Sequence, residues 1–115
     1  MDDGLKCNDF IVLGRNYNNI ILQYRDILYF ECRLNYVQIV TVDDSKYLYR
    51  ATMSSLEQLL LNYNFVRIHS GFLVPINKIK NYKKGTVELI DGTILKVSRK
   101  YIKSFKYIYL KYLGG

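Results

Sequence analysis

The sequence contains no tryptophan, one proline, one histidine and two cysteines. A structural zinc site takes four cysteine, histidine or acidic ligands, most often cysteine and histidine, so these three residues cannot complete one by themselves. Cys7 and Cys32 lie 25 positions apart and form no CxxC motif, which favours buried or idle thiols over a redox or metal centre. We therefore expect no metal and no other cofactor.

Long apolar runs are also missing. No segment approaches the ~20 residues that a membrane-spanning helix needs. The first residues, Met1-Asp2-Asp3-Gly4, are acidic and polar, whereas a secretory signal begins with a basic stretch followed by an apolar one. These absences predict a cytoplasmic protein.

The residue combinations that catalysis requires are sparse. His69 is the one histidine available as a general base, and Ser70 is merely its neighbour in the sequence. Gly71, Gly85 and Gly92 are isolated from one another, so no glycine-rich phosphate-binding loop is present. The carboxylates are dispersed. We expect no enzyme and no small-molecule substrate.

The charge is abundant and one-sided. The 115 residues suit one domain and carry a formal net charge of +7. Residues 78–115 hold ten lysines or arginines and two acidic residues, while residues 1–77 are nearly neutral. Such a surface favours a polyanion, either nucleic acid or an anionic membrane face. The alternative is a solvated lysine-rich face that serves solubility.

Short runs of β-branched and aromatic residues, separated by turn-forming residues, predict a mostly β domain. Residues 1–9 are predicted to be a linker or frayed segment, and residues 10–115 a single domain, with a turn-rich stretch at 14–19. The predicted strands lie at 10–13, 20–22, 27–31, 36–42, 46–50, 86–90 and 93–97, with shorter extended pieces between 65 and 74.

A hairpin and a short helix give the clearest local signals. Asp91-Gly92 between two alternating segments predicts a two-residue turn in which both central residues have positive φ. The leucines at 56, 59 and 60 are spaced along one face of a helix over 54–62. Ser54 and Glu57 match a capping box for that helix, and Thr52 is a rival cap.

A second helix is predicted at the C-terminus, with Ser98 as its cap. Its apolar stripe comprises Tyr101, Ile102, Phe105, Ile108, Tyr109, Tyr112 and Leu113. We expect the tyrosines of this stripe in the core rather than as stacking platforms for single strands. Arg99 and Lys100 would then lie in the first turn of the helix, where N–H groups and the helix dipole favour a phosphate. A solvated helix start is the alternative.

Four segments, taken in order, resemble LytTR-type DNA-binding domains. They are Asp26-Ile-Leu-Tyr-Phe-Glu31 with Asn35-Tyr36, Thr52-Met-Ser-Ser-Leu-Glu-Gln-Leu59, Phe65-Val-Arg-Ile-His69 with Phe72-Leu-Val74, and Asp91-Gly92 with Val97-Ser-Arg-Lys-Tyr101. The resemblance covers residues 10 to 110. It implies an elongated, mostly β fold of three small antiparallel sheets, a short internal helix and a C-terminal helix.

The same resemblance implies a bacterial transcriptional regulator or the output domain of a two-component response regulator. Members bind double-stranded DNA through loops inserted in successive major grooves. The implied partners are duplex DNA, bound in tandem or as a dimer on repeated half-sites, and an upstream receiver domain outside this chain or a membrane partner protein.

The resemblance also implies which residues contact DNA. Asn35, Tyr36, Ser70 and Arg99 match the positions of base contacts, and His69 is expected to be structural. The positions implied for the DNA backbone are Arg33, Arg67, Gly71, Lys100 and Lys103. Ser70 and Gly71 depart from the usual Arg or Asn followed by Ser, which shortens the reach of the central loop.

Two alternative functions stay open. One is a protein-interaction module of a LytTR-like regulator, for example with a membrane partner, that has lost specific DNA reading. The other is a nonspecific nucleic-acid binder, whose affinity falls with salt but shows little preference among sequences.

Overall fold

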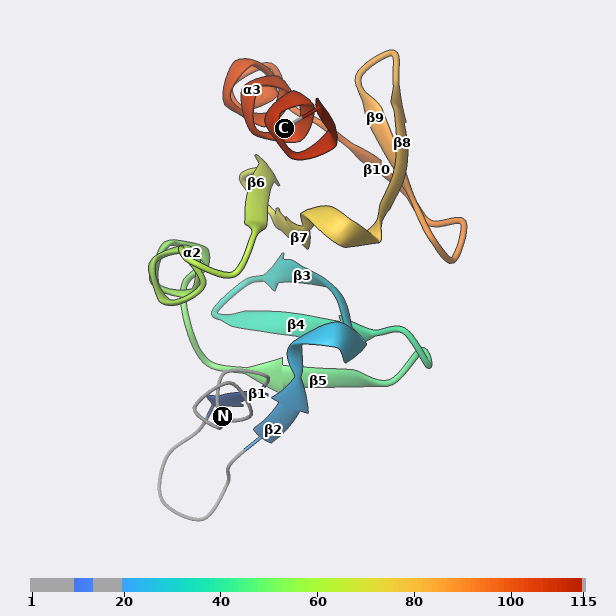
Figure 1. The fold of residues 1–115 in the computed structure, drawn as a ribbon. Coiled ribbons are helices and arrows are strands. Elements are labelled where there is room, and N and C mark those ends of the chain that lie inside the picture. Colours follow the sequence, from blue (N-terminus) through green and yellow to red (C-terminus); the bar gives the residue numbers. More distant parts are fainter. Residues whose placement is uncertain (1–9, 14–19, 115) are drawn as a thin grey trace.

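The computed structural model describes residues 10–13 and 20–114. The predicted N-terminal linker and the predicted turn-rich stretch at 14–19 lie outside the described residues. Within them the chain forms three antiparallel sheets and two α-helices (Figure 1), as the resemblance implied. The principal extents are 43 × 40 × 25 Å. The molecule is therefore a flat body, long in two directions and thin in the third.

A five-stranded sheet with the order β5-β4-β3-β7-β6 crosses the middle of the molecule in Figure 1. A two-stranded sheet, β1-β2, and a three-stranded sheet, β10-β9-β8, complete the β structure. The strands are β1 Phe10–Leu13, β2 Ile20–Gln23, β3 Ile27–Arg33, β4 Tyr36–Thr41, β5 Lys46–Tyr49, β6 Phe65–His69, β7 Phe72–Pro75, β8 Ile79–Lys83, β9 Thr86–Leu89 and β10 Ile94–Lys96.

The helical elements connect these strands. The α-helices are α2 Met53–Leu59 and α3 Ile102–Gly114, and the 3-10 helices are η1 Tyr24–Asp26 and η2 Ile76–Lys78. No helix in the described part of the chain has the length and apolar character to cross a bilayer.

The strands β3, β4 and β7 of the five-stranded sheet are buried on both faces, because alternate residues of these strands enter two separate cores. Phe30 pairs with Leu73 across β3 and β7, and both pack with α2 and the β1-β2 sheet. Val66 and Ile68 of β6 enter the second core, where Phe105 of α3 meets the three-stranded sheet. The central sheet therefore links α2 on one face with α3 on the other.

The short helix begins earlier than the capping box predicts. Thr52 is the N-cap, and its Oγ1 accepts a hydrogen bond from the Ser55 N–H at 3.0 Å. Glu57 does not reach back to the helix start but pairs with Arg67 on β6. The rival cap is correct, and with Thr52 as the cap the third helical residue is Ser55, so Glu57 lies two residues too far along the helix to close a capping box. The helix ends at Leu59, which is exposed.

The two-residue turn predicted at Asp91-Gly92 is found at the other hairpin of the three-stranded sheet. At Asp91-Gly92, the Leu89 N–H donates to the Thr93 carbonyl, leaving a three-residue loop in which Gly92 alone has a positive φ, of 94°. The two-residue turn with two positive φ values lies instead at Lys84 (50°) and Gly85 (81°), between β8 and β9.

The C-terminal helix begins at Ile102, later than a cap at Ser98 predicts. Ser98 instead starts a turn, closed by a hydrogen bond from the Tyr101 N–H to the Ser98 carbonyl at 3.0 Å. Of the apolar stripe, Phe105 is fully buried, whereas Tyr112 is 49% exposed and Leu113 61%. The prediction that Tyr112 belongs to the core is wrong, because the second half of α3 extends past the sheets that cover its first half.

Replacing Phe105 by alanine tests this division of α3. Phe105 is 0% exposed and lies between Tyr82 and Tyr109, with ring centroids 5.4 and 5.2 Å away. We expect Phe105→Ala to lower the free energy of unfolding by about 3–5 kcal/mol. The control Leu110→Ala, at a site 64% exposed, should change it by less than about 0.5 kcal/mol in the same denaturant titration. Equal losses would contradict the division.

Candidate nucleic-acid interface

Two exposed turns lie side by side at one end of the five-stranded sheet. Leu34 and Asn35 connect β3 to β4, and Ser70 and Gly71 connect β6 to β7. β7 runs antiparallel to β3, so the two turns emerge at the same end. The Cys32 N–H donates to the Gly71 carbonyl at 2.9 Å. This hydrogen bond fixes the first turn to the second.

A third turn, residues 98–101, lies beside these two, and the three turns together form a row. The Ser98 N–H donates to the Ile68 carbonyl at 2.8 Å, which attaches this turn to β6. β6 is the outer strand of the five-stranded sheet, on the side away from β3. The third turn, which carries Arg99, therefore lies beyond the second, and Ser70 occupies the middle of the row.

Arg67 of β6 joins these turns to both helices. Its guanidinium donates to the carbonyls of His69 and Ser70 at 3.0 and 2.7 Å, and to Glu57 of α2 at 2.9 Å. The Arg67 Cζ also lies 5.4 Å from the centre of the Tyr101 ring, just before α3. Its side chain is only 11% exposed. Arg67 is thus largely occupied with holding the protein together.

His69 and Gly71 shape the central turn. The His69 Nδ1 accepts a hydrogen bond from the Gly71 N–H at 3.1 Å. Gly71 thereby uses both its N–H and its carbonyl within the protein. An added Cβ at Gly71 would lie 3.7 Å from the His69 Nδ1, an ordinary contact, so space does not require glycine here.

The remaining side chains predicted to contact DNA point into solvent from the three turns or beside them. Tyr36 begins β4 and is 42% exposed, and it pairs with Arg33 across β3 and β4. The exposed members of the predicted set are Arg33, Asn35, Tyr36, Ser70, Arg99, Lys100 and Lys103. The structure thus separates exposed candidates from Arg67, His69 and Gly71, whose polar groups bond within the fold.

Arg50 is an exposed basic residue near the row that the sequence did not indicate. Asn35 and Ser70 line a shared hollow of about 400 Å³ together with Arg50 and the Thr52 cap of α2. Arg50 follows β5 and is exposed. A single arginine between a strand and a helix carries no distinctive sequence signal, and only the sheet order brings it to Asn35.

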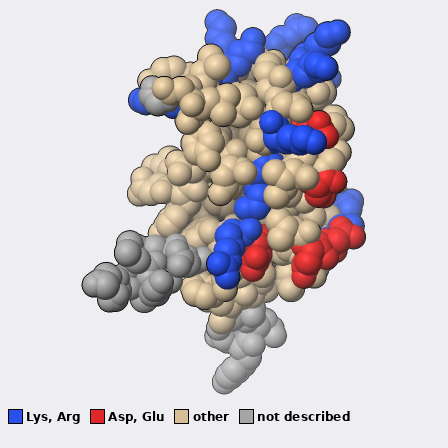
Figure 2. Space-filling model, turned by 45° about the vertical axis from the view of Figure 1, so that its right-hand side comes forward, with Lys and Arg blue, Asp and Glu red and all other residues tan. Residues whose placement is uncertain are grey.

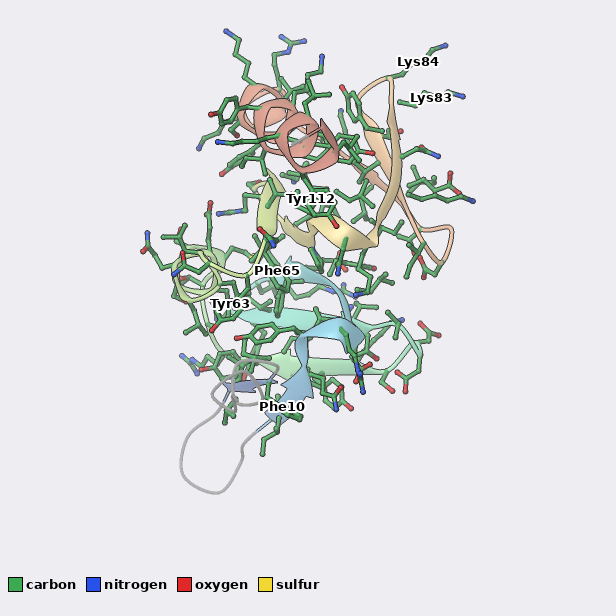
Figure 3. All side chains as sticks on the ribbon, in the orientation of Figure 1. Phe10, Tyr63, Phe65, Lys83, Lys84 and Tyr112 are labelled. Atoms are coloured by element: carbon green, nitrogen blue, oxygen red, sulfur yellow. The ribbon has the colours of Figure 1, made fainter. Side chains whose placement is uncertain are left out.

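A second hollow lies at the other end of β6 and β7, near Phe65 and Pro75. It has a volume of about 320 Å³, and the stacked rings of Tyr24 and Tyr63 line it, with centroids 4.4 Å apart. Burial raises the pKa of Tyr24 to about 12, and Tyr63 adds to the shift. Figure 3 shows Tyr63 and Phe65 near the middle of the molecule. This hollow is therefore separate from the row of turns.

The positive charge gathers around α3 and the three-stranded sheet. Figure 2 shows lysine and arginine side chains alone at the upper end of one face, while acidic side chains lie lower down among further basic ones. Lys78 does not belong to this surface, because it is 6% exposed and its burial lowers the pKa of its amine, opposed by Asp26. The third turn, with Arg99 and Lys100, lies beside the basic end.

The fold and the row define a small, mostly β domain that presents turns on one side. The family model of the LytTr DNA-binding domain matches residues 17–109, and the chain belongs to this family. Its fold is similar to the solved LytTr DNA-binding domain of a response regulator from Bacillus cereus, with a TM-score of 0.73 and 20% identity over 93% of this chain and 98% of that one.

A longer relative is the sensory transduction protein LytT of Bacillus subtilis (strain 168). The two are 33% identical over 92 residues, which is 76% of this chain. The match spans 38% of the length of LytT.

Substitution of Arg67 tests its role as the link between the turns. Arg67→Met removes the hydrogen bonds that the charged guanidinium donates to two carbonyls, and each such bond contributes about 1.5–3 kcal/mol. We therefore expect the free energy of unfolding to fall by at least the contribution of one of these bonds, about 1.5 kcal/mol. Glu57→Gln should cost less than about 1 kcal/mol, because Glu57 is 43% exposed and solvent screens its ion pair.

Denaturant titration of both variants provides the measurement, with Arg25→Met at an exposed site of η1 as the matched control. A loss from Glu57→Gln as large as that from Arg67→Met would show that the ion pair, not the carbonyl bonds, holds the turns.

Proposed function

We propose that this chain binds double-stranded DNA sequence-specifically, as a transcriptional regulator or as the output domain of one. In this proposal the β3–β4 turn and the turn before α3 enter successive major grooves, and the Ser70 turn faces the DNA between them. The observation that supports it best is the row itself: three exposed turns held in order by the Cys32–Gly71 and Ser98–Ile68 hydrogen bonds.

The exposed side chains of the row suit base recognition. Asn can bond adenine through two hydrogen bonds and Arg can bond guanine likewise, each pair giving about 1–3 kcal/mol of discrimination. Asn35 and Arg99 are exposed and are assigned these roles, with Tyr36 beside Asn35. Arg33, Lys100 and Lys103 would contact phosphates and fix the register without reading sequence.

The central turn is assigned a weaker role. The Ser70 carbonyl is held by Arg67, which leaves the short hydroxyl side chain to face the DNA. Arg67 and Gly71, first predicted as backbone contacts, are assigned to positioning this turn, since their polar groups bond within the protein. His69 has the same positioning role through its bond to the Gly71 N–H.

The wider context is also a proposal. Residues 10–115 would form the DNA-binding domain, acting in the cytoplasm, joined to a receiver domain or working with a membrane partner. One small domain offers limited contact area, so we propose tandem or dimeric binding on repeated half-sites. Neither catalysis nor a small-molecule substrate enters this function.

One observation favours a protein-interaction module as the second candidate. The second half of α3 exposes large apolar side chains, including Leu110 (64%) and Leu113 (61%). Exposed apolar patches mark protein contacts when they are contiguous. If this surface carried the main function, binding of a protein would persist in an Arg99→Asp variant.

Selection of duplexes from a random pool, followed by titration of the selected duplex, tests the proposal. We expect a motif with repeated half-sites. Arg99→Ala should lose about 1–3 kcal/mol of preference at particular base pairs, because its paired hydrogen bonds to guanine are lost. Arg25→Ala, which removes the same charge from η1, should keep the preference.

A different outcome would contradict the proposed base contacts. If no motif emerges, and Arg99→Ala and Arg25→Ala weaken binding equally for every duplex, the chain is a nonspecific nucleic-acid binder and the proposed base contacts are wrong.

A further inference from the structure

The tip of the β8–β9 hairpin lies next to the segment that carries Arg99. The Val97 N–H donates to the Gly85 carbonyl at 2.8 Å, so the Lys84-Gly85 turn and the residues leading to Arg99 share one end of the three-stranded sheet. The Thr86 Oγ1 donates to the Lys83 carbonyl at 2.9 Å and closes the turn. The tip is therefore fixed by local bonds beside the third turn of the row.

Lysines surround this end of the sheet. Lys83 and Lys96 both pair with Thr86, one on each side, so their side chains lie on the same face, roughly 10 Å apart across two strand spacings. Figure 3 shows Lys83 and Lys84 projecting from the hairpin tip. From α3, the Lys106 Nζ lies 5.8 Å from the centre of the Tyr82 ring, on the same hairpin.

The tip lysines are not neutralised by the described acidic residues. Glu88 lies 4.0 Å from Lys80, farther down the hairpin, and accepts a hydrogen bond from Asn81. Asp91 bonds Thr93 at the other end of the sheet. Within residues 10–13 and 20–114, no carboxylate lies within ion-pair distance of Lys83. The same holds for Lys84, Lys96 and Lys106.

The backbone at Lys84 is in the left-handed conformation. Its φ of 50° is a conformation that favours glycine, asparagine or aspartate in a two-residue hairpin turn. Lysine at this position carries a conformational cost, and such residues gather at functional sites. Solubility alone would be served equally by a lysine in an unstrained position.

We propose that Lys83, Lys84 and Lys96 form a phosphate clamp that grips the DNA backbone beside the base pairs read by Arg99. The clamp rests on the proposed function, and it extends the DNA contact from the three turns onto the three-stranded sheet. It recognises phosphate and not sequence, so it supplies affinity and fixes the position of the Arg99 turn.

Salt dependence of binding tests the clamp. Each phosphate contact contributes about 0.9 to the slope of log K against log salt concentration. We expect Lys83→Gln/Lys84→Gln to lower the magnitude of that slope by about 1–2, equally on the selected duplex and on a duplex of mixed sequence. The base preference should not change, because Arg99 remains in place.

The matched control removes two exposed lysines from other surfaces, Lys46 on β5 and Lys111 near the end of α3, as Lys46→Gln/Lys111→Gln. Melting temperatures of both double variants should stay close to that of the wild type. An equal loss of slope in the two variants would overturn the clamp, because it would show only the effect of net charge. An unchanged slope in Lys83→Gln/Lys84→Gln would overturn it as well.

The two proposals fail in different ways. If the clamp is wrong but Arg99→Ala still loses its base preference, the proposed function stands without the clamp. If no duplex is preferred but Lys83→Gln/Lys84→Gln still loses slope, the hairpin contacts phosphates and the specific-reading proposal is wrong.

Discussion

The Arg67 guanidinium is the interaction on which the candidate interface depends. One side chain holds the backbone of the central turn, the α2 helix through Glu57, and the ring that precedes α3. Guanidinium suits this task, because its planar fork offers five donors in fixed directions and stays charged. Two backbone hydrogen bonds extend the same constraint to the neighbouring turns. The result is one row of connected turns rather than three independent loops.

Much of the fold was predictable from local patterns. The apolar runs identified most strands, and Leu56 and Phe105 marked the buried faces of the helices. β8 was missed, because a register shift between Ile79 and Asn81 interrupts its alternation. The Lys84-Gly85 turn was missed, because lysine replaces the asparagine or aspartate that signals such turns. Both features, the register shift in β8 and the positive φ at Lys84, are local backbone geometry that the residue pattern does not indicate.

The candidate site was predictable only as separate segments. The motif around His69 indicated a structural role, but no sequence spacing shows that Arg67 bonds the carbonyls of the turn it precedes. The row depends on the strand order β4-β3-β7-β6, which brings the turns at 34–35 and 70–71, far apart in the sequence, to one end of a sheet. The neighbourhood of Lys84 and Arg99 likewise depends on the pairing of β8, β9 and β10.

Mapping the DNA contact by amide chemical shifts of the isotope-labelled chain tests the central claim most directly. On addition of a selected duplex, the account predicts the largest shifts at the three turns, residues 34–36, 70–71 and 98–100, and at the hairpin tip, with little change around Leu110 on α3. Shifts concentrated on the exposed face of α3, with the turns unaffected, would contradict it.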